Sequence, residues 1–316
     1  MKRRLILACI VTLSTMKVFA SCGSSSCPID LNALNKPAPG GFSADISYEY
    51  INQNQPRIGT RSAAVGELPA EHDEVRTSNR ITSLLLRYGA GDRWIFSATL
   101  PYIDRAHDHL ADGITPEHWN LRGIGDITLQ ARRRVSKSFW VIGGVKLPAG
   151  ATSLANSAGE KAEVPIQPGT GSVDEIVGFT YERGVNAATP VHGEMGNIAR
   201  IPLFLTATYR RNGNAARGYR VGNEIQINTG TAYPITHSIE ALLQLNGRSK
   251  ARDVNPEAGG RDPFTGGKTL FVSPGVRWSA DRAAFYALMQ LPVYRDYNGL
   301  QLSAKRQLIT GIQVRF

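Results

Sequence analysis

The sequence has no long hydrophobic run beyond its N-terminus. No stretch of 18 apolar residues follows residue 20, and a membrane-spanning helix needs about 20. This absence excludes a helical membrane protein. It does not exclude a membrane β-barrel, whose strands alternate apolar and polar residues and therefore show no hydrophobic run.

Motifs for catalysis and cofactor binding are also absent. The chain has only three cysteines and no C-x-x-C-H haem-attachment motif. His237 adjoins Ser238, but neighbouring side chains of a strand point to opposite faces, so no catalytic triad can be nominated. Gly123 and Gly125 form a G-x-G motif that precedes a predicted strand. The glycine-rich loop of a nucleotide-binding site precedes a helix instead, so this motif does not indicate one. We therefore expect no enzyme, no cofactor and no nucleic-acid partner.

The first 20 residues have the pattern of a secretory signal peptide. A basic head is followed by an apolar stretch from Leu5 to Leu13 and by small residues before a cleavage site. Removal of residues 1–20 takes away four basic residues and no acid, so the net charge falls from +10 to +6. A retained anchor helix is the alternative, but Lys17 interrupts the apolar run.

Residues 21–41 are rich in Ser, Pro and Gly and predict a flexible periplasmic leader. Cys22 and Cys27 lie in this leader, where an oxidising compartment favours a disulfide. Two alternatives stay open: lipidation of Cys22, and a thiol pair that binds a metal or a periplasmic redox partner.

From Phe42 to Phe316 the sequence alternates with a period of two. In residues 221–233, apolar side chains such as Ile225 and Ile227 alternate with polar ones such as Glu224 and Gln226. This pattern predicts strands with one apolar and one polar face. Twelve strands are predicted, near 42–52, 77–89, 93–103, 125–135, 138–148, 172–183, 200–210, 220–232, 237–247, 269–279, 283–294 and 304–316.

Connections of two kinds join these strands. Short turns are predicted near 89–92, 135–137, 233–234 and 279–281, and long polar loops near 53–76, 104–123, 149–171, 248–268 and 295–303. The segment 184–199 is longer than an ordinary turn. This pattern is typical of an all-β transmembrane antiparallel barrel of the Gram-negative outer membrane, and an even strand number places both termini in the periplasm.

A soluble β-sandwich also has short alternating strands. Strand lengths near ten residues favour the membrane barrel instead. Aromatic residues near the predicted strand ends favour it too, because they form girdles at the membrane interfaces. The aromatic residues in question are Trp94, Tyr102, Trp140, Tyr209, Tyr233, Trp278 and Tyr294.

The last strand ends on an aromatic residue. Ile312, Val314 and Phe316 share one parity and predict an outward-facing recognition signal for the outer-membrane barrel assembly machinery. A soluble edge strand with this pattern would be prone to aggregate. Membrane lipid and lipopolysaccharide are the further partners expected of such a barrel.

Several strand ends followed by Gly- or Pro-containing loops resemble one family. They are TLPY at 99–102, GIGDITL at 123–129, GVKLPAG at 144–150, QLPVYR at 290–295 and NGLQL at 298–302. These segments resemble the outer-membrane barrel family known as phenol-degradation meta-pathway proteins or transporters. The resemblance covers most of residues 77–316 and implies a transport function.

The inward parity of the predicted strands presents polar and charged side chains to a lumen. These are Arg132, Arg134, Glu224, Gln226, Asn228, Glu240, Gln244, Asn246 and Arg277. They predict a passage for small solutes, including aromatic or organic-acid compounds, or alternatively a lumen plugged by its own side chains. A second hypothesis is a barrel that presents the Cys22–Cys27 leader to a periplasmic partner. His107, His109 and His118 are candidate metal ligands in a predicted loop.

Overall fold

The computed structural model describes residues 29–30, 37–68, 74–111, 113–156, 159–188, 198–256 and 259–316. The predicted signal peptide at 1–20 lies outside the described residues, as do Cys22 and Cys27 and most of the predicted leader. Among the residues that the structure describes, no helix is long and apolar enough to cross a membrane.

The described chain is almost entirely β-structure. The first barrel strands are β1 (Phe42–Gly59), β3 (Glu74–Ala90), β4 (Trp94–Ala111), β6 (Ile127–Arg134) and β7 (Phe139–Leu147). They are followed by β8 (Asp174–Ala188), β9 (Ile198–Arg211), β10 (Glu224–Pro234), β11 (Ile239–Lys250), β14 (Gly267–Ala280) and β15 (Ala283–Arg315). The described secondary structure also includes the strands β2 (Arg61–Ser62), β5 (Thr115–Ile124), β12 (Val254–Asn255) and β13 (Gly260–Arg261) and two 3₁₀ turns, η1 (Val164–Ile166) and η2 (Ala216–Gly218).

The residues labelled β15 form a hairpin of two arms. Its first arm pairs with β14 as far as Tyr297, and its second arm pairs with β1 from Leu300 onward. Gly299 has a φ of 62°, which the reversal between the two arms requires. Side chains of the two arms meet, since the Arg295 guanidinium donates to the Ser303 hydroxyl at 2.9 Å. The eleven labelled strands of the closed sheet therefore supply twelve segments to the barrel.

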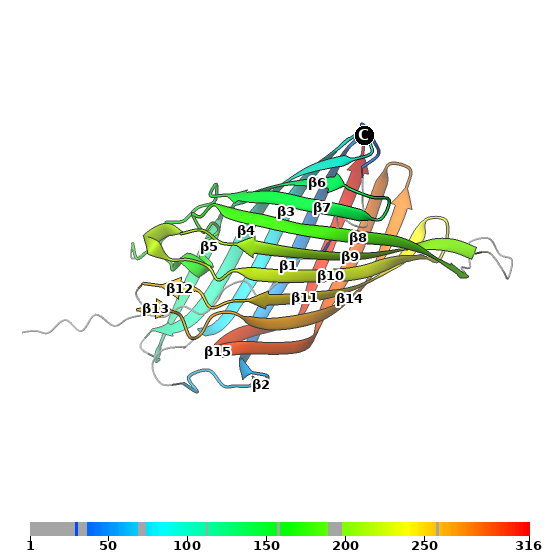
Figure 1. Cartoon of the computed structure of the whole chain (residues 1–316). Coiled ribbons are helices and arrows are strands. Elements are labelled where there is room, and N and C mark those ends of the chain that lie inside the picture. Colours follow the sequence, from blue (N-terminus) through cyan, green and yellow to red (C-terminus); the bar gives the residue numbers. More distant parts are fainter. Residues whose placement is uncertain are drawn as a thin grey trace, which may run out of the picture.

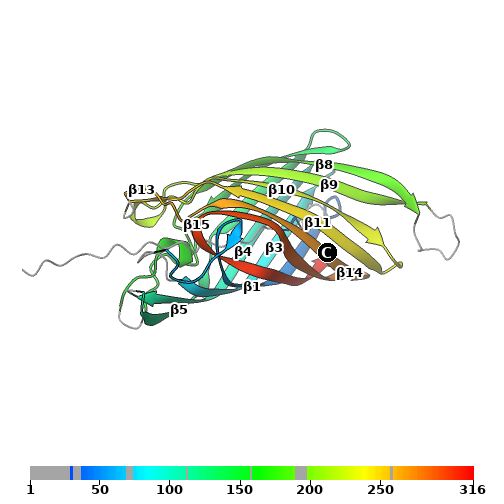
Figure 2. The same cartoon turned by 90° about the horizontal axis from the view of Figure 1, so that it is seen from below.

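The barrel closes between its first and last segments. Strand β1 pairs antiparallel with β15 on one side and with β3 on the other. The amide of Phe316 donates to the carbonyl oxygen of Phe42 at 2.9 Å, so the two ends of the barrel sequence meet. Figures 1 and 2 show a closed wall of tilted strands, with the C-terminus at one end of the barrel. The predicted closed antiparallel barrel is confirmed.

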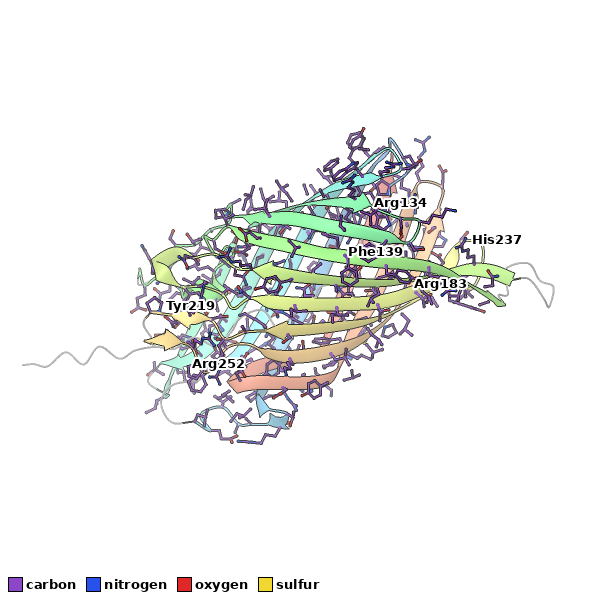
Figure 3. The ribbon with its side chains drawn as sticks, viewed as in Figure 1. Arg134, Phe139, Arg183, Tyr219, His237 and Arg252 are labelled. Atoms are coloured by element: carbon purple, nitrogen blue, oxygen red, sulfur yellow. The ribbon has the colours of Figure 1, made fainter. Side chains whose placement is uncertain are left out.

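The two ends of the barrel differ in their connections. One end, called the turn end, carries the C-terminus and the short turns; the other, called the loop end, carries β5, β12, β13 and residues 149–171 (Figure 1). Arg134, Phe139, Arg183 and His237 lie toward the turn end, whereas Tyr219 and Arg252 lie at the loop end (Figure 3). Within the predicted 184–199 connection, residues 184–188 continue β8 and residues 198–199 continue β9 beyond the turn end, whereas residues 189–197 lie outside the described part of the chain.

Two predicted loops are strands instead. Residues 104–123 form an antiparallel extension in which β4 pairs with β5, and residues 295–303 form the β15 hairpin. The exchange of partners occurs at Pro101, since β4 pairs with β6 up to Thr99 and with β5 from Tyr102. Proline has no amide hydrogen for a ladder, so a junction between partners accommodates it.

The two faces of the wall have opposite chemistry. The outer face exposes apolar side chains on every barrel strand, among them Ile46, Phe96, Leu129, Val177, Leu205, Ile227, Leu243, Val276, Phe285 and Leu308. A continuous apolar belt of this kind requires a lipid covering. Stacked ring pairs, such as Trp94–Phe96 and Trp278–Phe285, lie on this belt. Trp140 does not belong to it: its side chain is buried on the inner face, and its indole NH donates to Glu182.

Candidate functional site: a polar cavity inside the barrel

The barrel encloses a cavity of about 290 Å³. This volume is near the lower limit for small-molecule pockets. Hydroxyl and amide side chains dominate the lining, with a few aliphatic side chains and six ionisable ones. The hydroxyl groups come from Ser47, Ser83, Thr99, Thr128, Thr206 and Thr208, and the ionisable groups are Asp30, Asp45, Glu49, Arg132, Arg210 and Glu224.

Glu224 on β10 is the centre of an ion-pair network in the wall. Arg248 on β11 approaches its carboxylate at 2.7 Å, and Arg210 on β9 lies 3.9 Å away. The amide of Gln226 donates to the same carboxylate at 2.5 Å. Cross-strand register places these groups together, because Glu224 is opposite both Arg210 and Lys250. Two guanidinium groups around one carboxylate make this part of the wall net positive.

A part of the N-terminal segment lies inside the barrel. Gln244 contacts the backbone of Asp30 in both directions: its carbonyl oxygen accepts from the Asp30 amide at 3.2 Å, and its NH₂ group donates to the Asp30 carbonyl oxygen. The Asp30 carboxylate lies 3.4 Å from the guanidinium of Arg132, and both groups are buried. Ile29 packs against the inner-wall cluster that contains Tyr286 and Ile309. The prediction of a leader that lies entirely in the periplasm is therefore wrong for Ile29 and Asp30.

A second buried ion pair lies beside this segment. Arg87 on β3 lies 3.6 Å from the Asp45 carboxylate on β1, and both side chains are 1% exposed. The Tyr286 hydroxyl donates to the same carboxylate at 2.8 Å. Gly311 of the second β15 arm makes room for the Tyr286 ring, since an added Cβ would lie 2.4 Å from its hydroxyl oxygen.

The described residues of the 149–171 segment, 149–156 and 159–171, fold into the mouth of the barrel at the loop end. Ala162 and Ile166 of this segment are buried against Trp119 and Leu121 of β5 and Leu302 of β15. The side-chain amide of Gln167 donates to the carbonyl oxygens of Leu154 and Ala162, both at 2.9 Å. The segment was predicted as a polar loop, but its apolar side chains form a small core together with side chains of β5 and β15.

Asp126 anchors both ends of this segment. One carboxylate oxygen accepts from the amide of Gly150 at 3.1 Å, and the other accepts from the amide of Thr170 at 2.9 Å. Lys146 lies 2.5 Å from Asp126 and 3.1 Å from Asp174, and all three side chains are buried. Burial alone would raise the pKa of Asp126, but hydrogen bonds from Lys146 and Thr170 lower it below its usual value.

Most of the predicted lumen residues meet in this interior. Asn246 donates to Asn228 at 2.9 Å and to Gln244 at 3.1 Å, and the Ser273 hydroxyl donates to Asn246. Glu240 and Arg277 form an ion pair nearer the turn end. Arg134 differs: it is exposed at the end of β6, with its guanidinium 5.3 Å from the Trp140 ring centroid.

The predicted set of lumen residues lacks Asp30, Asp45, Glu49 and Arg87, all of which lie inside the barrel. For Asp45 and Glu49 a signal exists, since they alternate with Ala44, Ile46 and Tyr48 in the first predicted strand. Arg87 follows the same rule in the second strand. For Asp30 no local signal exists, because the residues around it have no strand periodicity.

The three candidate metal ligands have other partners. His107 is buried, with its ring nitrogen Nδ1 2.8 Å from the Thr77 hydroxyl. His109 lies 3.1 Å from Glu117, and His118 lies 2.7 Å from Asp108. No group of three ligand-type side chains that could hold a metal ion occurs within the described ranges.

A larger hollow of about 700 Å³ lies on the outer face of β1, β3, β4, β6 and β7. Its lining includes the small residues Ala44, Ala98, Ala131 and Gly143 beside larger apolar ones such as Leu129. It lies on the apolar belt, where lipid chains would cover it. The chemistry of the protein is therefore concentrated in the smaller, polar cavity inside the barrel.

No protein-family model and no curated protein has a significant match to the sequence. Solved structures do resemble it. An outer membrane channel from Pseudomonas putida F1 superposes with a TM-score of 0.64 at 12% identity, over 92% of this chain and 100% of that chain. This likeness concerns the fold, which is the closed antiparallel barrel described above.

Two further barrels have lower scores. The transport unit of the autotransporter AIDA-I from Escherichia coli has a TM-score of 0.49 at 11% identity, over 92% of this chain and 93% of that chain. CymD, a monoaromatic hydrocarbon channel, has a TM-score of 0.45 at 7% identity, over 95% of this chain and 98% of that chain.

Proposed function

We propose that this protein is an outer-membrane channel for small polar solutes, with its turn end in the periplasm and its loop end outside the cell. The passage runs through the lumen, along the cavity lined by Asp45, Glu224 and Arg132. The likeness to an outer membrane channel of Pseudomonas putida F1 supports the fold on which this proposal rests.

The observation that carries the proposal is the inversion of polarity across the wall. The outside of the barrel is apolar, whereas the inside holds buried ion pairs such as Asp45–Arg87 around a polar cavity. Ionised groups inside a membrane protein are costly, so they are retained mainly where they line a path for ions or solutes. A barrel that served only as a scaffold could fill its interior with aliphatic side chains at lower cost.

Two segments narrow the passage. Ile29 and Asp30 occupy the lumen, and residues 149–171 cover its mouth at the loop end. A channel of this kind conducts less than a wide porin and discriminates between solutes by charge and size. The alternative of a lumen plugged by its own side chains stays a prediction, and it differs from the channel in expecting no conductance.

Planar-bilayer recording tests the proposal. The mature protein, refolded in detergent, is expected to give discrete current steps, and a chain that starts at residue 37 is expected to give larger ones because Ile29 and Asp30 are removed. A heat-shift gel controls for folding of both proteins. If neither protein conducts although both are folded, the channel function is rejected.

The C-terminal strand fits the same proposal. The side chains of Leu308 and Phe316 are exposed on the outer face, and Phe316 closes the barrel at the turn end. We propose that Ile312, Val314 and Phe316 are presented from this end to the assembly machinery. The alternative of a leader that binds a metal or a redox partner through Cys22 and Cys27 stays a prediction, since both residues lie outside the described part of the chain.

A further inference from the structure

Glu49 stands out among the acids of the lumen cavity. It lies on the inner face of β1 and lines the cavity together with Ser47 and Ser83. Its cross-strand neighbours are Ile309 on one side and Ile81 on the other. The carboxylate is therefore placed between aliphatic side chains and directed into the enclosed space.

The other three acids of the cavity each have a basic partner. Asp30 lies 3.4 Å from Arg132, Asp45 lies 3.6 Å from Arg87, and Glu224 lies 2.7 Å from Arg248. In the part of the chain that the structure describes, Glu49 has neither an ion pair nor a hydrogen bond. A carboxylate held in apolar surroundings without a partner is costly, and a cation brought into the cavity would lower that cost.

We infer that the cavity is a binding site for a small solute with an ammonium group, and that Glu49 is its counter-charge. This inference rests on the proposed channel function and names the class of solute. An ammonium group has three donors; Glu49 accepts one, and the hydroxyl groups of Ser47 and Ser83 on the same inner face can accept the others.

A divalent metal ion fits the site less well. Calcium requires six to eight oxygen ligands, several of them carboxylates. Glu49 is the only acid lining the cavity that has no basic partner among the described residues, so a second free carboxylate is lacking there. A monovalent organic cation needs only one charge and a few acceptors.

The inference also opposes the overall charge of the protein. The net charge is +10 for the whole chain and +6 without residues 1–20, and a positive total charge by itself would favour anions. Selectivity is decided by the charge at the narrow part of a passage rather than by the total charge. The channel is therefore expected to select cations, and organic acids are not its preferred solutes.

The test compares Glu49→Gln with a matched control, Glu175→Gln. Glu175 is on the outer parity of β8, exposed, and paired with the equally exposed Arg211. Reversal potentials in a potassium chloride gradient report selectivity, and block of the potassium current by n-butylammonium reports binding. The wild type and Glu175→Gln are expected to be cation-selective and to be blocked; Glu49→Gln is expected to lose selectivity and to require at least about tenfold more n-butylammonium.

Calorimetry separates this inference from the channel function. If the wild type does not conduct, n-butylammonium is titrated into the detergent-solubilised protein and its Glu49→Gln variant. Binding by the wild type alone supports the site although the channel function has failed. An anion-selective wild type overturns the inference, as does a Glu49→Gln variant that matches the wild type in block and in heat of binding.

Discussion

Gly150 and Gly169 cross in direct backbone contact. A Cβ added to Gly150 would lie 2.6 Å from the Cα of Gly169, and a Cβ added to Gly169 would lie 2.6 Å from the Cα of Gly150. The crossing brings the two stems of the 149–171 segment together above Asp126, which accepts a hydrogen bond from the Gly150 amide. The loop can therefore enter the mouth only if both positions lack a side chain.

The first prediction concerns this crossing. In Gly169→Ala the added methyl group has only backbone atoms and the anchoring Asp126 carboxylate as close neighbours, so the stems must separate and the loop must leave the mouth. We expect a larger single-channel current and trypsin cleavage after Lys161, since the next residue, Ala162, is no longer buried. Gly143→Ala is the control, because a Cβ there meets nothing within 4 Å. Unchanged current and unchanged protection would contradict the role of the crossing.

The second prediction concerns the ion pairs at the loop end. Lys146→Met leaves the buried carboxylates of Asp126 and Asp174 without their cation, which costs about 3–5 kcal/mol. Urea denaturation followed by heat-shift gels should show the loss of stability. The exposed Lys268 offers a control, Lys268→Met, for which no change is expected. Adding Asp126→Asn to Lys146→Met removes one uncompensated charge and should recover part of the loss.

The third prediction concerns the segment inside the lumen. Asp30→Arg places two guanidinium groups side by side where Asp30 and Arg132 now pair, so Ile29 and Asp30 should leave the lumen and the current should rise. The double variant Asp30→Arg/Arg132→Asp restores an opposite-charge pair and should return the current toward that of the wild type. A double variant that conducts like Asp30→Arg would show that this ion pair does not retain the segment.

The fourth prediction is a pH effect in the β4–β5 extension, which projects beyond the barrel wall. Burial lowers the pKa of His107 to about 4. In the unfolded extension His107 therefore binds a proton at a higher pH than in the folded one. The free energy of unfolding of the extension is highest above the ordinary histidine pKa of about 6.5 and decreases as the pH drops toward 4.

Trp119 is opposite His107 in the strand register and is buried, so its emission reports the state of the extension. Subtracting the emission spectrum of Trp119→Phe from that of the wild type gives the emission of Trp119. This emission should shift to longer wavelength as the pH falls from 6.5 to 4. His107→Gln should reduce this shift, whereas His118→Gln, a change at a largely exposed side chain, should not. Equal shifts in wild type and His107→Gln would assign the effect to another group.

The alternation of residues 42–316 was sufficient to predict the barrel. Twelve segments were expected and twelve are found, with most bounds within a few residues, because a period of two directly reports which face a strand residue takes. The same alternation predicted the inner position of Gln244 and Asn246. The prediction that Trp140 belongs to the aromatic girdle was wrong, because a position near a strand end does not decide which face the side chain takes.

The sequence by itself determined the wall: which residues turn outward, which turn inward, and that the first and last strands must pair. These are properties of short segments, and a local pattern can report them. Only the tertiary structure decided what fills the lumen. Asp30 meets Arg132 and Gln244 from more than 100 residues away in the sequence, and Gly150 meets Gly169 across an entire loop. Contacts of this kind depend on the closed geometry of the barrel, which brings distant inner faces together without leaving a periodic trace in the chain.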